Sequence, residues 1–125
     1  MKQRLKKLGA IAVYLFGSRA RGRAGALSDY DIGVLLGENI PTKSFLDTKL
    51  GLIRIFSKFF KTDRIDIVIL NEAPALLAMN IIDEGRVLFD FAHEQRINFE
   101  TKTTMKYLDR LPHEQRYLDS LIASV

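Results

Sequence analysis

The stretch "FGSRARGRAGALSDYDIGVLL", residues 16–36, constrains this chain more than any other part of it. An apolar run ends in Gly17 and Ser18, three arginines follow, and the chain returns to an apolar segment that opens with Asp29 and Asp31. Strand interiors are poor in Asp, because a carboxylate that is buried without a partner costs several kcal/mol. The two aspartates therefore need either a specific charge partner or an exposed position.

The alternation of side chains along a strand predicts that Asp29 and Asp31 share one face. Residues two apart point to the same side, so both carboxylates can approach one divalent cation. Gly33 continues this face without a side chain, which would let a ligand come close to the backbone. The alternative is a turn in which Ser28 and Asp29 bond to nearby backbone groups while Asp31 faces solvent on an edge strand. Taken alone, these residues leave both interpretations open.

A third carboxylate, Asp66, interrupts the apolar segment "RIDIVIL". In a strand it would lie on the face opposite the three isoleucines, and beside residues 30–36 it could join Asp29 and Asp31. Three converging carboxylates repel one another unless a cation neutralises them. Ligands that are all oxygen favour Mg²⁺, with Mn²⁺ as a second possibility. The alternative for Asp66 is a surface position paired with Lys or Arg.

Gly17 and Ser18 suggest a site for the opposite charge. We predict that Ser18 caps a short helix at 18–24, whose free N–H groups and positive dipole end would attract an anion. The Ser18 hydroxyl, with Arg19 and Arg21, could then reach phosphate oxygens. Arg23 completes the basic cluster. The alternative is a basic, solvated turn.

The pattern of apolar residues predicts an α/β fold, with helices packed on a small mixed sheet. Strands are expected at 10–16, 30–36, 64–70 and 86–90, and helices at 2–8, 42–60 and 71–84. The helix at 42–60 carries a group of phenylalanines at helical spacing that should lie in the core, although part of it could instead line an adenine slot: Phe45, Phe56, Phe59 and Phe60.

The residues after 89 differ in composition, being polar with only a thin apolar stripe. We predict a helical extension over 90–125 in which Pro112 breaks or kinks the helix and a second helix covers 113–124. Such a tail cannot build its own core, so it must pack on residues 1–89 or on another protein. His93 and His113 are expected to be surface residues.

Composition narrows the class of protein. The chain has 125 residues, 47% of them hydrophobic, which suits one domain. It has no cysteine, which excludes a disulfide scaffold and thiolate chemistry. The net charge of +4 is small and the arginines gather at 19–23, so a local anion site is favoured over a nucleic-acid surface. No apolar run is long enough for a membrane span, and we expect a soluble, cytoplasmic protein.

The spacing of these motifs resembles a known family. Gly17-Ser18, ten residues and then Asp29-Tyr30-Asp31 is similar to the signature of the DNA polymerase beta-like nucleotidyltransferases. With "RIDIVIL" and "EGRVLF", the chain resembles the minimal nucleotidyltransferase (MNT) family, and within it the MntA-type antitoxins of HEPN/MNT toxin–antitoxin pairs. The resemblance covers residues 10–90, so 1–89 would be the nucleotidyltransferase core.

The resemblance implies a function as well as a fold. It implies transfer of AMP from ATP, with Mg²⁺, to a tyrosine of a HEPN-type ribonuclease toxin that binds the protein and is silenced. Ser18 and the Gly17 backbone would hold the outer phosphates, and Asp29 and Asp31 would bind two metal ions. Asp66 would bind one of these ions and orient or deprotonate the attacking hydroxyl.

Two rival functions remain open at this point. One is a nucleotidyltransferase that modifies a small molecule such as an antibiotic, although a chain of this length leaves little room for an acceptor pocket. The other is a non-catalytic antitoxin that masks its partner. Three retained aspartates speak against masking alone, since a scaffold has no physical reason to hold facing carboxylates.

Overall fold

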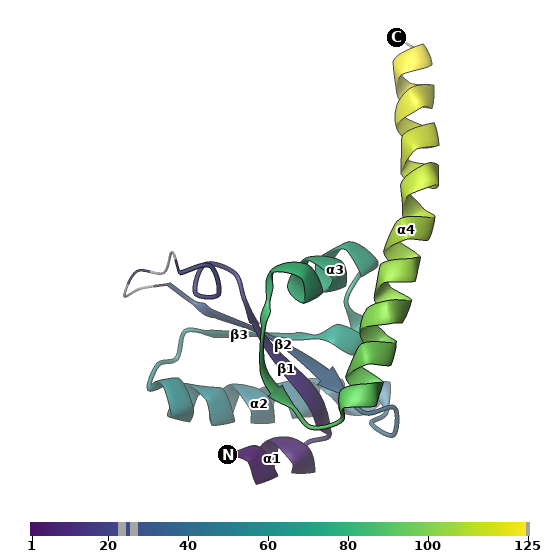
Figure 1. Ribbon diagram of the computed structural model, residues 1–125. Helices are drawn as coiled ribbons and strands as arrows, with labels where there is room; N and C mark the ends of the chain where they lie inside the picture. The colour runs from purple at the N-terminus through teal and green to yellow at the C-terminus, as the bar shows by residue number, and fades with distance from the viewer. Residues whose placement is uncertain (23–24, 26–27, 125) are drawn as a thin grey trace.

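Four strands form one mixed sheet in the order β3-β2-β1-β4 (Figure 1). They are β1 (Ala10–Phe16), β2 (Tyr30–Leu36), β3 (Ile65–Ile69) and β4 (Arg86–Asp90). β1 runs antiparallel to both β2 and β4, whereas β2 and β3 are parallel. The computed structural model describes residues 1–22, 25 and 28–124, and Arg23 lies outside them. The predicted α/β fold class is confirmed.

Helices cover both faces of the sheet (Figure 1). α1 (Lys2–Lys7) and α2 (Phe45–Phe60) pack on one face, while α3 (Ala75–Glu84) and the long α4 (His93–Ala123) lie on the other. Short 3₁₀ turns, η1 (Thr42–Ser44) and η2 (Leu70–Glu72), precede α2 and α3. The successive apolar residues of β1 and β2 provide apolar side chains to both faces of the sheet, because neighbouring residues in a strand point to opposite sides.

The two faces have separate apolar cores. On the α2 face, Phe56 and Leu52 pack against strand residues such as Ile32 and Ile67. On the α3 face, Ile81 and Ala78 pack against alternate residues of β1 and β2. Of the predicted phenylalanine group, Phe45 and Phe56 are buried, whereas Phe59 is exposed.

Several predicted boundaries are wrong by a few residues. The third strand is Ile65–Ile69, because Leu70 already belongs to η2. The helix predicted at 71–84 is divided: η2 ends at Glu72, and α3 begins only after Pro74. Proline has no backbone N–H and restricts the residue before it, so it separates the two segments.

The prediction for the tail is also wrong in one respect. α4 continues from His93 to Ala123 with Pro112 inside it, so there is no separate second helix. Of the described residues, none forms a helix with the length and apolarity that a membrane span requires.

A polar network fastens the start of α4 to the sheet. The hydroxyl of Tyr14, which is buried in β1, donates to Glu100 at 3.0 Å, and burial together with this carboxylate raises the pKa of Tyr14. Arg96 bonds to Glu100 at 2.5 Å and to Asp90 at 2.9 Å. Hydrogen bonds to His93 and Arg96 hold the pKa of Asp90 below its usual range. The network therefore joins α4 to both β1 and β4.

This network predicts a pH-dependent stability. A carboxyl whose pKa is lower in the folded protein stabilises the fold above its unfolded pKa of about 3.9, and the contribution is lost as the pH falls through the folded pKa. We expect Asp90→Asn to lower the free energy of unfolding by about 1–2 kcal/mol at pH 7. Urea titrations at pH 7 and pH 3 would show this difference shrinking at the lower pH. An equal loss at both values would contradict the role of the Asp90 charge.

Candidate active site

Asp31 and Asp66 lie side by side at one end of the sheet. The parallel register of β2 and β3 pairs Asp31 with Asp66, so the two side chains leave the same face of neighbouring strands. β2 lies between β3 and β1, which excludes the alternative of Asp31 on an edge strand. The structure thus brings together two carboxylates that are far apart in sequence.

Asp29 precedes β2, which starts at Tyr30, so the two aspartates do not both belong to the strand. The Asp29 side chain is exposed, and its Oδ1 atom lies 4.0 Å from Nη1 of Arg64. It is nevertheless close enough to Asp31 to influence its charge. All three predicted carboxylates therefore lie in one region.

Asp31 is partly buried and lies near the negative charges of Asp66 and Asp29. Partial burial raises the pKa of Asp31, and the negative charges of Asp66 and Asp29 raise it further. Arg21 opposes this shift. A group of like charges in one place lowers stability unless a cation binds there. The protein thus retains an unfavourable arrangement that a bound cation would relieve.

Gly17 provides the space that Asp31 occupies. A Cβ atom built on Gly17 would lie 2.2 Å from Oδ2 of Asp31, so a side chain at this position would force the carboxylate to move. The residue also has a φ of 75°, in the left-handed region that favours glycine. The glycine of the sequence motif therefore lets the carboxylate lie directly against the end of β1.

The segment after Gly17 is a turn, so the prediction of a helix capped by Ser18 is wrong for the described residues 18–22. Two backbone bonds close the turn, from the Arg21 N–H to the Gly17 oxygen at 3.3 Å and from the Gly22 N–H to the Arg19 oxygen at 3.4 Å. Gly22, at a φ of 69°, prevents a helix from continuing. Ser18 still lies directly beside Gly17, at the same end of β1.

Arg19 is engaged in holding this loop. Its guanidinium donates through Nε and Nη2 to the Ser28 carbonyl, at 3.2 and 2.9 Å. It also lies over the Tyr30 ring at 3.8 Å, and Tyr30 stacks on Phe60 with centroids 4.0 Å apart. Arg19 therefore connects the turn to the start of β2 and to α2.

Arg21 joins the turn to the opposite helix. Its Nη1 atom donates to Oε2 of Glu84, the last residue of α3, at 3.1 Å. Both side chains are about half exposed, so the pair adds little to stability. Its effect is positional, because it keeps a cation beside Asp31.

The expectation that Gly33 admits a ligand is wrong. Gly33 is buried, and a Cβ atom there would lie 3.1 Å from Cγ2 of Ile81. The missing side chain instead allows α3 to pack closely on β2. Gly33 itself therefore gives a ligand no access to the backbone of β2.

The carboxylates suit a hard divalent cation in their chemistry. Carboxylate oxygens are the ligands that Mg²⁺ and Mn²⁺ prefer, and the negative charges of Asp66 and Asp29 near Asp31 would attract such a cation. Within the described ranges, however, no three acidic or histidine side chains already surround one point closely enough to hold a metal ion. Asp31 and Asp66 form the paired part of the donor set, and the exposed Asp29 stands beside them.

The sequence interpretation missed three residues of this region: Tyr30, Arg64 and Glu84. Tyr30 supports Arg19, and Glu84 supports Arg21. Arg64 is the residue before β3 and lies near Asp29. Only the adjacency of Tyr30 to Asp29 and Asp31 could have been noticed in the sequence, because the other two depend on tertiary structure.

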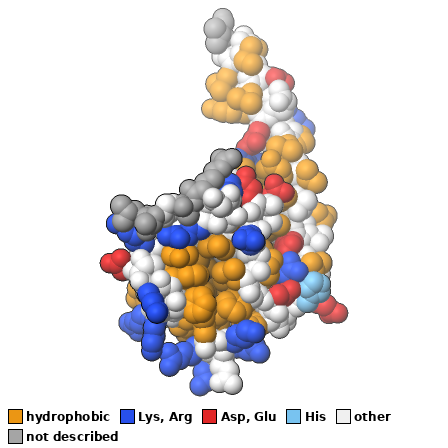
Figure 2. All heavy atoms as spheres, turned by 60° about the vertical axis from the view of Figure 1, so that its left-hand side comes forward, with side chains coloured by type: hydrophobic (Ala, Val, Ile, Leu, Met, Phe, Trp, Pro, Cys, Tyr) orange, Lys and Arg blue, Asp and Glu red, His pale blue; other side chains and the backbone are white. Residues whose placement is uncertain are grey.

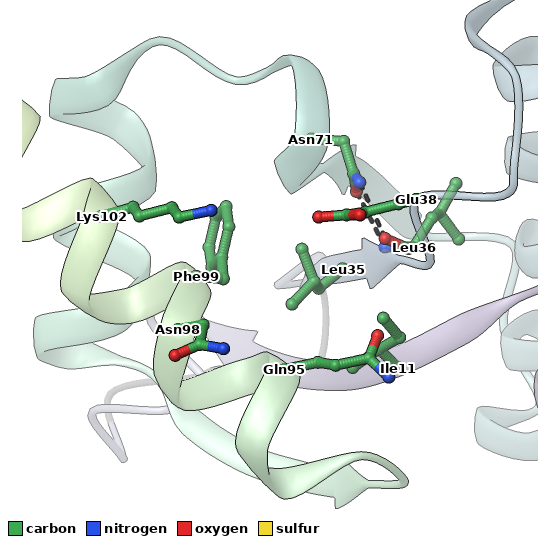
Figure 3. Close-up of a pocket in the computed structure, with 9 residues that line it drawn as sticks. All are labelled: Ile11, Leu35, Leu36, Glu38, Asn71, Gln95, Asn98, Phe99 and Lys102. Carbon is green, nitrogen blue, oxygen red and sulfur yellow. Dashed lines mark hydrogen bonds between the residues drawn. The ribbon is translucent and has the colours of Figure 1, made fainter.

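A separate hollow lies at the other end of β2 and has a volume of about 230 Å³ (Figure 3). Apolar side chains of Leu35 and Phe99 line it, together with polar residues of α4. The Asn71 amide, at its edge, bonds to the backbone N–H and oxygen of Leu36, both at 2.8 Å. Because the three residues between Asp31 and Leu35 separate the two regions, this hollow is no part of the carboxylate site.

The chain is similar to a known protein family and to a named relative. A family model described as polymerase beta, nucleotidyltransferase matches residues 1–94. A relative from Aphanizomenon flos-aquae (strain 2012/KM1/D3), named protein adenylyltransferase MntA, is 30% identical over 117 residues, covering 86% of this chain and 75% of the relative.

Two solved structures are similar in fold. A toxin–antitoxin with AMP-PNP matches with a TM-score of 0.75 and 23% identity, covering 97% of this chain and 94% of the other. A tri-AMPylated Shewanella oneidensis HEPN toxin in complex with MNT antitoxin gives a TM-score of 0.68 and 21% identity, covering 97% and 92%. At these identities the likeness establishes the fold.

Proposed function

Because this chain belongs to the polymerase beta nucleotidyltransferase family, we propose that it transfers AMP from ATP to a tyrosine hydroxyl of a HEPN-type ribonuclease toxin and thereby acts as an antitoxin. The observation that carries the proposal is the register of Asp31 with Asp66 beside Gly17. The curated relative is named a protein adenylyltransferase, which supports the choice of AMP and of a protein acceptor.

The chemistry is an in-line displacement at the α-phosphorus of ATP. The tyrosine oxygen forms a bond to this phosphorus. The bond between the phosphorus and the oxygen that bridges the α- and β-phosphates breaks, and pyrophosphate leaves. Asp66 is the residue we assign to orient the hydroxyl and accept its proton. Bound at Asp29, Asp31 and Asp66, two Mg²⁺ ions would stabilise the charge on the entering and leaving oxygens.

The turn supplies the groups for the rest of the triphosphate. Ser18 and the backbone at Gly17 are assigned to the outer phosphates, with Arg21 as the nearby cation. Arg19 already bonds to the Ser28 carbonyl through Nε and Nη2, so we assign it first to holding the loop. Because Arg21 is assigned to phosphate binding and Arg19 to holding the loop, substitutions of the two arginines should have different effects.

The proposed reaction is tested by incubating the protein with α-³²P-labelled ATP, Mg²⁺ and a HEPN-type toxin cloned from the same genome. We expect label on the toxin, which mass spectrometry should locate on tyrosine. Label on an aminoglycoside in place of the toxin would favour the small-molecule alternative. Protection of cells without any label would favour masking.

The two arginines should respond differently in this assay. We expect Arg21→Gln to raise the KM for ATP by about tenfold, because it removes a charge-assisted contact to phosphate. Arg19→Gln should mainly lower the melting temperature, since it loses the Ser28 bonds and the Tyr30 stack. If Arg21→Gln left the KM unchanged, Arg21 would have no phosphate role.

A further inference from the structure

The second half of α4 leaves the body of the protein. Up to Thr104 the helix packs on the sheet and α3, through residues such as Phe99 and the buried Thr103. Beyond that point it projects past α3, as Figure 1 shows. Large apolar side chains along it are 40–72% exposed, and they gather visibly on the projecting helix in Figure 2.

Most of these side chains share one side of the helix. They follow one another at steps of mainly three or four residues, which places them in a single stripe. We call this stripe, which Met105 and Leu121 border on either side, the α4 ridge: Leu108, Leu111, Leu118 and Ile122. Tyr117, also exposed, lies outside the ridge: at 100° per residue it is opposite Leu108 and about 100° or more from the other ridge residues. A narrow stripe with this spacing is the kind that packs against one other helix.

The projecting helix also lacks the support that a single helix needs. Pro112 removes a backbone hydrogen bond, which costs about 3 kcal/mol in a helix interior. Pairs four residues apart brace it, Arg110 with Glu114 and Gln115 with Asp119, but such pairs contribute only about 0.2–0.5 kcal/mol each. A partner that covers the ridge would supply the missing stability.

The ridge continues toward the candidate active site. Met105 also borders a shallow hollow of about 350 Å³ between α3 and α4, which Ile82 and Ile97 line. Glu84, which holds Arg21 beside the carboxylates, lies two residues beyond Ile82. The ridge, the hollow and Asp31 all lie on the α3 side of the sheet. A protein bound along this surface would therefore approach the carboxylates.

The charges that flank the ridge disfavour a second copy of the chain. In a parallel pair of ridges, Glu114 would face Asp119 of the other copy, and in an antiparallel pair that overlaps the whole ridge the two Glu114 side chains would meet. Like charges at such flanking positions destabilise helix pairing. Arg110 already pairs with Glu114, but exposed pairs of this kind are weak, so a partner helix with Lys or Arg beside its apolar stripe would add a complement to both carboxylates.

We propose that the projecting part of α4 is a docking helix for the acceptor protein. It binds an apolar helix of that protein, flanked by basic residues, and thereby directs the acceptor hydroxyl to Asp31 and Asp66. The identification of this acceptor as the HEPN-type toxin rests on the function proposed above. The docking itself concerns a different surface from the nucleotide site, so the two can be tested separately.

The test compares two variants of the full chain. Leu108→Ala with Leu118→Ala removes two ridge side chains and keeps the helix, since alanine has the highest helix propensity. The matched control is Tyr117→Ala, which removes an exposed aromatic side chain that lies outside the ridge. Toxin binding is measured by isothermal calorimetry, and ATP binding by thermal shift. We expect the ridge variant to bind the toxin at least tenfold more weakly, with ATP binding and the control unchanged.

Two further measurements complete the test: toxin binding by a variant with reversed charges beside the ridge, and the oligomeric state of the free protein. Glu114→Lys with Asp119→Lys should also weaken toxin binding, because it opposes the basic flanks of the partner. Wild-type affinity in the ridge variant, or no toxin binding by the unmodified protein, would overturn the proposal. So would a dimer of the free protein in light scattering that the ridge variant loses. If binding needs the ridge but no AMP is transferred, the docking helix stands and the proposed reaction falls.

Discussion

Replacing Asp31 with Asn is expected to lower AMP transfer by about a thousandfold, with no loss of stability in the nucleotide-free protein. The amide keeps the size of the side chain, which lies against Gly17, but removes the negative charge that Asp66 and Asp29 oppose. Relief of this repulsion should leave the melting temperature equal to that of the wild type or above it. Catalysis and stability thus make opposite demands on this residue.

Thermal shift with Mg²⁺ and ATP provides the second readout of this prediction. A ligand that binds only the folded state raises its stability, so the wild-type melting temperature should rise in Mg-ATP and that of Asp31→Asn should rise much less. Asp47→Asn is the matched control, because this exposed aspartate lies on α2, which packs on the other face of the sheet. A strong fall in the melting temperature of Asp31→Asn would show that the carboxylate is structural.

Gly17→Ala is expected to damage both the fold and the reaction. The new Cβ atom would clash with Oδ2 of Asp31. In addition, alanine is less stable than glycine in the left-handed backbone conformation of this residue. Gly22→Ala is the matched control, since Gly22 has a similar φ but no atom of the described residues close to its Cβ position. The control should lose about 1–2 kcal/mol of stability and keep most of its activity. Gly17→Ala should lose more stability than this, and about a hundredfold in activity, because Asp31 must move.

A double-mutant cycle separates the clash from the backbone effect. With Asp31→Ala in the background, the carboxylate is absent, so Gly17→Ala should cost clearly less stability than it does in the wild type. Denaturant titrations of the four proteins give the coupling free energy. A coupling of zero would mean that Gly17 is needed for its backbone conformation alone.

The sheet and its helices were largely predictable from residue patterns. The strands at 10–16, 30–36 and 86–90 agree with the structure, because each is a continuous or alternating apolar run between clear turn residues. The predicted helix at 42–60 begins as η1 and continues as α2, since its apolar side recurs at helical spacing. These signals are local, so no tertiary contact was needed to read them.

Predictions failed where a local signal had more than one structural outcome. Ser18 is a good helix cap, but Gly22 stops the chain from forming a helix there. Pro112 usually ends a helix, yet α4 continues through it. Gly33 lies beside Asp31 in the strand pattern, where it suggested access for a ligand, but its neighbour is Ile81 of α3. The identity of the element that covers each position decided these cases.

The sequence by itself determined the kinds of group available, namely a glycine-serine turn, two aspartates two residues apart and a third aspartate on a later strand. The tertiary structure alone decided their arrangement. The parallel pairing of β2 with β3 placed Asp66 beside Asp31, and the contact of Arg21 with Glu84 set a cation next to them. Residue type and spacing are properties of the chain, whereas register and packing depend on which distant segments bury each other's apolar surface.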